Sequence, residues 1–368
     1  MYSVVIFCQY DKMKTLYKSI LKELLVSFLL TLAFLNSILM MEKLLRLSRL
    51  LSGVGASLFD MAKIIILLQP QLMLLTIPMA LLLSTLLVYG RMNMDNEIIV
   101  MKAAGMNFMR ISFPVMVLGI LCFCACISVG FSLGPKSSIK LRETLAQIIT
   151  LRSTVSVEAG TFNTAFKNVV IMVKGKKADN TLGDIFIYDS RHADEPTVLM
   201  AKEGKFFIQE GFNIGLYLKN GYVNMTKGDS ITEMFFDRYN MVLSIDAESP
   251  STKKIEYTPT QLLEDAKKAG SSKKAAGLYL EFDRRISLPA VCLILIFMGP
   301  PLALIAGKSG RLGGLAIGLL VFTLYYMLLI YGENIVMAGK ISHLIGAWAP
   351  CMLLSVIGGV LFIKAGSS

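Results

Sequence analysis

The region between residues 134 and 285 contains no cysteine, although the whole chain has six. A folded domain in that region has no disulfide and must be stabilised by its own hydrophobic core. Histidine is also scarce, because His192 and His343 are the only two, and they lie too far apart in the sequence to suggest a catalytic pair. With no strong catalytic motif elsewhere, we expect a chain that is not an enzyme.

Convincing motifs for metal or nucleotide binding are also missing. Three cysteines lie at i, i+2 and i+4 of one apolar segment: Cys122, Cys124 and Cys126. The middle one points away from the other two, so small apolar packing explains them better than a metal site does. Gly307-Lys308-Ser309 has the end of a phosphate-binding loop, but Leu302 stands where such a loop needs its first glycine. We expect no metal and no cofactor bound directly by this chain.

The chain has a net positive charge but no motif for binding nucleic acid. The chain has 37 basic and 26 acidic side chains and a formal net charge of +11. A helix-turn-helix, a zinc finger or an aromatic-basic RNA motif would have to accompany that excess to indicate nucleic acid, and none does. Basic residues on the cytoplasmic side of a membrane, near anionic lipid, explain the charge more simply.

The chain is rich in long apolar segments. Hydrophobic residues make up 54% of it, and its mean hydropathy is +0.61, far above that of an ordinary soluble protein. The apolar segments cover about 21–41, 62–89, 111–133, 286–306, 313–332 and 341–363. Each is close to the ~20 residues that a helix needs to cross a bilayer. The predicted fold class is a polytopic α-helical membrane protein with six transmembrane helices.

The distribution of basic residues predicts the orientation of these helices. Lys14, Lys18 and Lys22 precede the first span, and further Lys and Arg residues lie in the 90–110 loop and the 307–312 turn. Because cytoplasmic loops carry the excess of basic residues, these segments and both termini are expected in the cytoplasm. No clean signal peptide is present, and Met1 and Met13 remain alternative translation starts. Residues 134–285 then face outward, into the periplasm if the cell is Gram-negative.

Residues 134–285 form a polar insertion between residues 1–133, with the first three spans, and residues 286–368, with the last three. Short alternating runs separated by Gly and Asn predict strands of an antiparallel sandwich or jelly roll. The runs are 168–173, 184–189, 197–201, 205–209, 214–219, 222–225, 232–239 and 241–245. A polar helix is expected at 260–269, with a cap at Thr258 or Thr260 and a stop at Gly270.

An amphipathic segment lies at about 95–105, in the loop after the second span. Asp95 and Glu97 stand at its beginning, where the helix dipole favours acids, and Ile98, Met101 and Lys102 form one face at i, i+3 and i+4. One interpretation is a helix that lies on the membrane surface. The other is a short helix that docks into the groove of a partner protein.

The segment NEIIVMKAAGM, at residues 96–106, resembles the cytoplasmic coupling helix of the LptF/LptG permeases, also called the YjgP/YjgQ family. Residues 282–318, FDRRISLPAVCLILIFMGPPLALIAGKSGRLGGLAIG, resemble a second part of that family, and MEKLLRL at 41–47 matches the end of its first helix. The resemblance covers nearly the whole chain, including the two sets of three spans. The KSGR turn and the last two spans favour the F member.

This resemblance implies a permease subunit of an ABC-type lipopolysaccharide exporter in the inner membrane. The family pairs an F with a G subunit, sits on a dimeric cytoplasmic ATPase that uses the ATP, and works with a single-span periplasmic partner. It extracts lipopolysaccharide from the outer leaflet and passes it through jelly-roll domains to a periplasmic bridge. The residues expected to contact the ATPase are Glu97, Asp95, Ile98 and Met101. The carboxylates of Glu97 and Asp95 suit a basic groove.

Basic residues on the outer side are the candidates for substrate binding: Lys43, Arg46, Arg49, Arg284 and Arg285. The first three fall on one face if the first helix continues. Lys43 and Arg46 match basic positions of the family that border its lipid cavity. The phosphates of lipid A suit Arg and Lys, and Glu333 is expected to pair with these residues in the absence of lipid. The alternative is that they reach the headgroups only as membrane anchors.

The sequence is also compatible with a second function. The chain has the architecture of a transporter half, but a membrane-anchored receptor or envelope-assembly factor, with a β domain that binds a partner, has the same outline. Copurification with an ATPase, or ATP hydrolysis stimulated by lipopolysaccharide, distinguishes the two.

Overall fold

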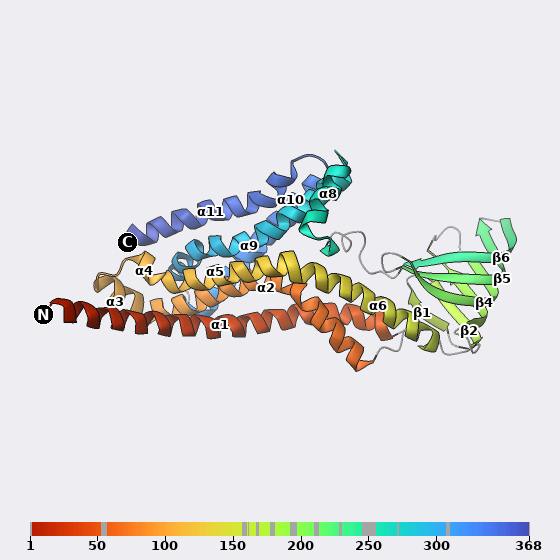
Figure 1. Cartoon of the computed structure of the whole chain (residues 1–368), viewed down its shortest axis with the longest axis horizontal. Helices are drawn as coiled ribbons and strands as arrows, with labels where there is room; N and C mark the ends of the chain where they lie inside the picture. Colours follow the sequence, from red (N-terminus) through yellow and green to blue (C-terminus); the bar gives the residue numbers. More distant parts are fainter. Residues whose placement is uncertain are drawn as a thin grey trace. The chain divides into compact units, whose positions relative to one another are not determined.

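The computed structural model of the chain (Figure 1) describes residues 2–52, 57–156, 160, 162–166, 169–176, 181–191, 197–209, 213–227, 230–244, 255–270, 272–306 and 310–367. It divides into two compact units. The helical unit comprises Met1–Leu39, Pro70–Pro135 and Tyr257–Ser368, and the second unit comprises Met40–Gln69 and Lys136–Glu256.

Long helices account for most of the chain (Figure 1). They are α1 (Tyr2–Ser52), α2 (Leu58–Met94), α3 (Glu97–Ala103), α4 (Phe108–Ile111), α5 (Phe113–Ser128), the π-helical turn η1 (Val129–Leu133), α6 (Gly134–Ser156), α8 (Pro259–Lys268), α9 (Lys273–Ala306), α10 (Gly310–Met337) and α11 (His343–Ser367). Among the described residues, six stretches are long and apolar enough to cross a membrane: Thr15–Leu45, Leu58–Met94, Phe113–Leu145, Lys273–Ala306, Gly313–Met337 and His343–Gly366. The prediction of six spans is confirmed.

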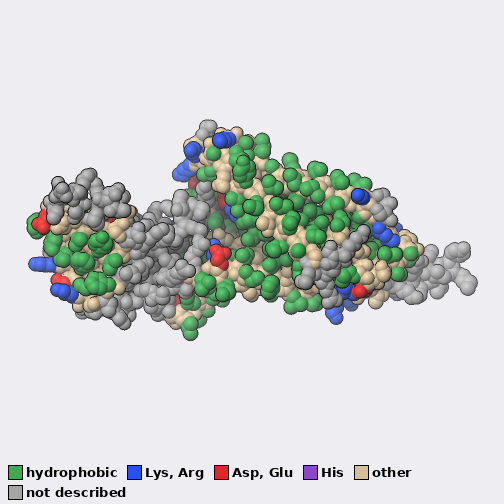
Figure 2. Space-filling view, turned by 180° about the vertical axis from the view of Figure 1, so that it is seen from behind, with side chains coloured by type: hydrophobic (Ala, Val, Ile, Leu, Met, Phe, Trp, Pro, Cys, Tyr) green, Lys and Arg blue, Asp and Glu red, His purple; other side chains and the backbone are tan. Residues whose placement is uncertain are grey.

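The helical unit is packed around one apolar core. Leu24 of α1, Leu81 and Tyr89 of α2, and Cys292 of α9 are fully buried in it. The outward faces are apolar as well, and Figure 2 shows hydrophobic side chains over most of the visible helical surface. A polar exterior is what water requires, so this surface suits lipid. Cys122 and Cys126 are buried and Cys124 is exposed, as the i, i+2, i+4 spacing predicts.

The third span does not end where its apolar sequence ends. A π-helical turn at Val129–Leu133 leads directly into α6, which continues the helix to Ser156. The polar character of this stretch led to its assignment to the soluble insertion. Its helical periodicity is weak in the sequence because α6 has a narrow apolar stripe: Leu145 and Ile148 are buried with Ile64 and Leu68 of α2. The first part of the insertion is therefore a helix.

The β strands of the insertion form one antiparallel sheet of six strands. They are β1 (Phe162–Phe166), β2 (Val169–Lys176), β3 (Leu182–Asp189), β4 (Thr197–Gln209), β5 (Asn213–Lys227) and β6 (Ser230–Ser244). Their order in the sheet is β1-β2-β3-β4-β5-β6, so each described strand pairs with its neighbours in sequence. The predicted inserted β domain is confirmed. Its described strands have the order of a meander, whereas a jelly roll has Greek-key connections between two sheets.

Glycines explain why the predicted strands are shorter than the real ones. The sequence places turns at Gly204 and at Asn220-Gly221, yet both lie inside long strands. A Cβ at Gly204 would collide with the side chain of Ile185, and a Cβ at Gly221 with the carbonyl oxygen of Met200. These glycines let neighbouring strands approach closely, which is a known use of glycine within sheets. Two pairs of predicted runs consequently merge into β4 and β5, and a third pair merges into β6, where Asn240 continues the strand.

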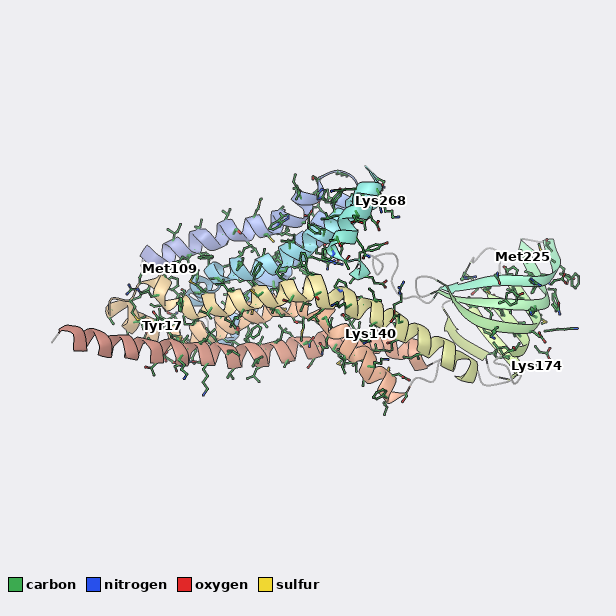
Figure 3. All side chains as sticks on the ribbon, viewed as in Figure 1. Tyr17, Met109, Lys140, Lys174, Met225 and Lys268 are labelled. Carbon is green, nitrogen blue, oxygen red and sulfur yellow. The ribbon has the colours of Figure 1, made fainter. Side chains whose placement is uncertain are left out.

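One face of the sheet carries the apolar core of the domain. Alternate residues of the strands are buried in it, such as Ile185 and Ile187 of β3 and Leu216 and Leu218 of β5. This period of two is what a half-buried strand requires. Figure 3 shows Lys174 and Met225 on the same sheet, and both of their side chains are exposed.

The short helix α8 agrees closely with its prediction at 260–269. The hydroxyl of Thr258 accepts a hydrogen bond from the backbone N–H of Gln261, and the Gln261 side chain accepts one from the Thr258 N–H. This reciprocal capping box fixes the beginning of the helix. Gly270 follows the end with φ of +62°, a left-handed conformation that favours glycine.

Candidate coupling and ligand sites

The loop after α2 folds into the short helix α3. Asn96 precedes it in a left-handed conformation, with φ of 59°, and turns the chain sharply after the end of α2. Ile98 is 1% exposed and Met101 8% exposed, both within the core of the helical unit. Two buried anchors therefore hold this seven-residue helix against the rest of the unit. Such a helix would not be stable alone.

The burial of Ile98 and Met101 corrects their predicted role. Both were assigned to contact with a partner, but their side chains are enclosed by this chain and anchor α3 from within. The apolar side chains that point outward are Ile99, 57% exposed, and Val100, 65% exposed. Sequence reasoning missed them because the spacing i, i+3, i+4 identifies an apolar face but not whether it faces this chain or another protein.

Arg91, in the last turn of α2, lies at the centre of a cluster of carboxylates. Its Nε and Nη2 donate to the two carboxylate oxygens of Glu23 at 2.8 Å each. Its Nη1 donates to Asp95 Oδ2 and to Glu97 Oε1, both at 3.1 Å. We call Arg91, Glu23, Asp95 and Glu97 the Arg91 cluster. It was not predicted, since Glu23 lies 68 residues from Arg91 in the sequence.

The Arg91 cluster is electrostatically unbalanced. One guanidinium faces three carboxylates, so its own members leave a formal charge of −2. The side chains of Asp95 and Glu97 keep 51% and 43% of their surface exposed. Exposed ion pairs of this kind contribute at most about 1 kcal/mol each, because water screens them. The cluster is thus suited to attract a cationic group more than to stabilise the fold.

Further contacts fasten the α3–α4 segment to other helices of the unit. Lys102 Nζ donates to the carbonyl oxygen of Ala365 at 3.0 Å, near the end of α11, and lies 5.3 Å from the ring centre of Phe108. The Phe108 ring is 5.4 Å from that of Phe362. A cation near helix C-terminal carbonyls is favourable. A displacement of α3 is therefore resisted by α11.

Two hydrogen bonds tie the end of α2 to its neighbours in the same region. The hydroxyl of Tyr89 donates to the carbonyl oxygen of Ile111 at 2.7 Å, and Asn93 Nδ2 donates to that of Leu304 on α9 at 3.2 Å. Tyr89 is fully buried, so the loss of its bond would leave an unsatisfied polar group in an apolar core. Figure 3 labels Tyr17 and Met109 at this end of the helical unit.

The basic residues of α1 lie on a continuous helix, as the face argument requires. α1 runs without a break from Tyr2 to Ser52 and so includes Lys43, Arg46 and Arg49. Lys43 is half-buried. The side chains of Arg46 and Arg49 lie outside the described residues. Lys43 belongs to the second unit, whereas Arg284 and Arg285 belong to the helical unit, so a common site for all five residues remains a prediction.

The two neighbouring arginines of α9 have different environments. Arg284 is partly exposed and its Nε lies 3.6 Å from Glu333 Oε1 of α10, which confirms the expected pairing with Glu333. Arg285 is 4% exposed, donates from Nη1 to the carbonyl oxygen of Tyr257 at 2.8 Å, and lies 3.4 Å from Glu281. This burial corrects the assignment of Arg285 to substrate binding, because its guanidinium is committed to contacts within the chain. Arg284 remains a candidate for substrate binding.

An acid and a histidine meet beside these arginines. His343 Nδ1, at the start of α11, lies 2.6 Å from Asp283 Oδ2 of α9, and the His343 ring stacks on Tyr279 at 4.8 Å. The side chain of Asp283 is 10% exposed and that of His343 is 30% exposed. No local pattern predicts this pair, since the two residues lie 60 positions apart. Together with Arg284 and Glu333 they form what we call the α9–α11 pairs.

Six apolar helices and an inserted sheet define a multi-pass membrane protein. Comparison with known proteins identifies the family. A family model described as lipopolysaccharide export system permease LptF/LptG matches residues 18–364, nearly the whole chain. The chain therefore belongs to the LptF/LptG family of lipopolysaccharide export permeases.

One similar protein has no assigned activity. The chain is 23% identical over 228 residues to the uncharacterized protein RP871 of Rickettsia prowazekii (strain Madrid E). The alignment covers 60% of this chain and 61% of that protein. The chain thus spans less than two thirds of the length of this relative.

Proposed function

We propose that this chain is one permease subunit of an ATP-driven complex that exports lipopolysaccharide. In this proposal it lies in the inner membrane with the β domain in the periplasm, pairs with a second permease subunit, and binds a dimeric cytoplasmic ATPase. A single-span periplasmic protein completes the complex. The chain itself hydrolyses no ATP. It extracts lipopolysaccharide from the outer leaflet and passes it to a periplasmic bridge.

The observation that carries the proposal is the composition of the outward surface of α3. Ile99 and Val100 are exposed beside the acidic Arg91 cluster. A helix that lies on a membrane surface instead carries Lys and Arg on its polar face, because cytoplasmic lipids are anionic. An apolar pair flanked by carboxylates that share one arginine suits a groove with an apolar floor and a basic edge. Docking to a basic partner is therefore favoured over membrane binding.

The lipid is proposed to meet this chain at basic side chains of α1 and α9. Lys43, Arg46, Arg49 and Arg284 offer point charges and guanidinium forks that suit the phosphates of lipid A. Arg284 is held by Glu333 at 3.6 Å, a loose pairing that an incoming phosphate can replace. We expect the double variant Lys43→Ala and Arg46→Ala to crosslink less lipopolysaccharide than the wild type. Lys63→Ala, an exposed lysine on α2, is the control.

The β domain is proposed to receive the acyl chains on its apolar face. Leu216 and Leu218 of β5 lie on that face. Photo-crosslinkers at these two positions are expected to capture lipid only while ATP is hydrolysed. The same probe at Lys219, on the exposed side of β5, serves as the control. Equal labelling at all positions, or none during turnover, would indicate a packed core without a transport role. Phe206, Phe207 and Ile208 of β4 are further candidates for this role, and their side chains lie outside the described residues.

The decisive experiment is purification of the chain from native membranes, followed by measurement of ATP hydrolysis in nanodiscs. We expect an ATPase to copurify, and its hydrolysis to rise with lipopolysaccharide but not with phosphatidylethanolamine. A chain that copurifies with a periplasmic protein alone, and with no ATPase, would instead be a receptor or assembly factor.

A further inference from the structure

Arg91 joins two parts of the helical unit that have different roles in the proposed function. On one side it holds Glu23 of α1 through two parallel hydrogen bonds of 2.8 Å. On the other side it holds Asp95 and Glu97, which begin the coupling segment, through bonds of 3.1 Å. The planar guanidinium fork fixes the orientation of the Glu23 carboxylate in a way that a lysine cannot.

α1 is the span on which such a connection has the greatest effect. Only 17% of its most apolar window is buried, the smallest share among the six candidate spans, whereas the corresponding share for α2 is 72%. A helix with few buried side chains is weakly held by its own chain and moves at low energetic cost. The same continuous helix carries Lys43, Arg46 and Arg49 further along. Glu23 and these candidate lipid-binding residues therefore belong to one helix.

We infer that Arg91 is a positioning residue that connects the docking of the ATPase at α3 with the position of α1. This inference rests on the proposed function. Three carboxylates share one guanidinium. A cationic group of the ATPase that binds Glu97 or Asp95 therefore removes a carboxylate that competes with Glu23 for Arg91. Arg91 is then held more strongly by Glu23. Lipid bound near Lys43 acts on the same helix in the reverse direction, because coupling between two sites is reciprocal.

The connection predicts a separation of ATPase binding from lipid stimulation. Glu23→Gln keeps the size of the side chain and leaves Arg91 in contact with Asp95 and Glu97. We expect the variant complex to retain its ATPase at the wild-type ratio. The ratio of lipopolysaccharide-stimulated to unstimulated hydrolysis should fall about fivefold or more, the effect of a lost coupling of ~1 kcal/mol. A contribution of Glu23 to folding alone would lower the yield of complex and leave this ratio unchanged.

Two further variants define the test, which uses the full complex in nanodiscs. Lys22→Gln changes an exposed charge on the adjacent residue of α1 and should keep the wild-type ratio. Arg91→Lys keeps the positive charge but loses the fork, so it should lower the ratio to a value between those of the wild type and Glu23→Gln. If Glu23→Gln does not accumulate, Arg91→Lys decides the question alone.

The inference is overturned if Glu23→Gln or Arg91→Lys responds to lipopolysaccharide as the wild type does, or if Lys22→Gln loses as much stimulation as Glu23→Gln. These outcomes leave the proposed function intact, because the wild-type complex still carries an ATPase that lipid stimulates. A wild-type chain that copurifies with no ATPase contradicts the proposed function itself, whatever the variants do.

Discussion

The Arg91 cluster and the α9–α11 pairs differ in the number of acids that face each basic side chain. In the cluster, one arginine faces three partly exposed carboxylates. In the pairs, each acid has its own basic neighbour: Glu333 faces Arg284 and Asp283 faces His343. Each of these pairs joins two helices of the unit, α9 to α10 or α9 to α11. An unbalanced, exposed cluster has binding capacity left for another molecule. The comparison separates residues that hold this chain together from residues available to a partner.

The largest expected effect is on the unbalanced cluster. Glu97→Lys places a second cation beside Arg91 and presents a positive charge to the basic groove proposed on the ATPase. A like-charge contact of this kind costs several kcal/mol, and about 4 kcal/mol corresponds to roughly a thousandfold loss of affinity. The amount of copurified ATPase measures it. Glu264→Lys, the same change at an exposed site on α8, is the control. Wild-type recovery of ATPase with Glu97→Lys would remove the cluster from the interface.

The next largest effect separates the two arginines of α9. Arg285→Ala removes a buried guanidinium and leaves Glu281 and the carbonyl of Tyr257 without it, which should cost about 3 kcal/mol of stability. Arg284→Ala should cost less than about 1 kcal/mol, because that pair is partly exposed. Thermal unfolding of the detergent-solubilised protein measures both. Equal losses would show that burial does not distinguish the neighbours.

A smaller effect is expected from the pair that joins α9 and α11. Asp283→Asn and His343→Gln should each destabilise the protein, and their double variant should lose less than the sum. The non-additive part should be about 1 kcal/mol, typical of directly interacting residues. Unfolding temperatures of the four proteins give this value. Strict additivity would mean that the 2.6 Å contact contributes nothing to stability.

The smallest effect tests whether Arg284 can be released from Glu333 to bind lipid. Glu333→Gln removes the charge that faces Arg284 and should raise capture of a lipid phosphate by roughly two- to threefold, the equivalent of ~0.5 kcal/mol. Crosslinking of lipopolysaccharide to a probe near Arg284 measures the change. Asp265→Asn on α8 is the control, since Asp265 has a lysine partner at 3.9 Å and no part in the pairs. Unchanged capture would leave Arg284 as a structural residue.

Much of the fold follows from local features of the sequence. The six spans follow from the length of apolar runs, the inserted sheet from alternation and turn residues, and α8 from its capping residues. All three signals depend only on residues that are close in the chain. The continuation of the third span through α6 was not predicted, because its apolar stripe is short. The full lengths of β4 and β5 were not predicted either. Gly204 and Gly221 allow neighbouring strands to pack closely, which the sequence of a single strand does not reveal.

The sequence by itself determined the family, the membrane class and the position of the short amphipathic helix α3. Only the tertiary structure decided which side chains of that segment face outward, because Ile98 and Ile99 are equally apolar and differ only in what surrounds them. It also decided that Arg284 is accessible while Arg285 is buried, since a one-residue step turns a side chain about 100° around a helix. The Arg91–Glu23 and Asp283–His343 contacts join residues 68 and 60 positions apart. Such partners are chosen by the packing of helices, which no local pattern encodes.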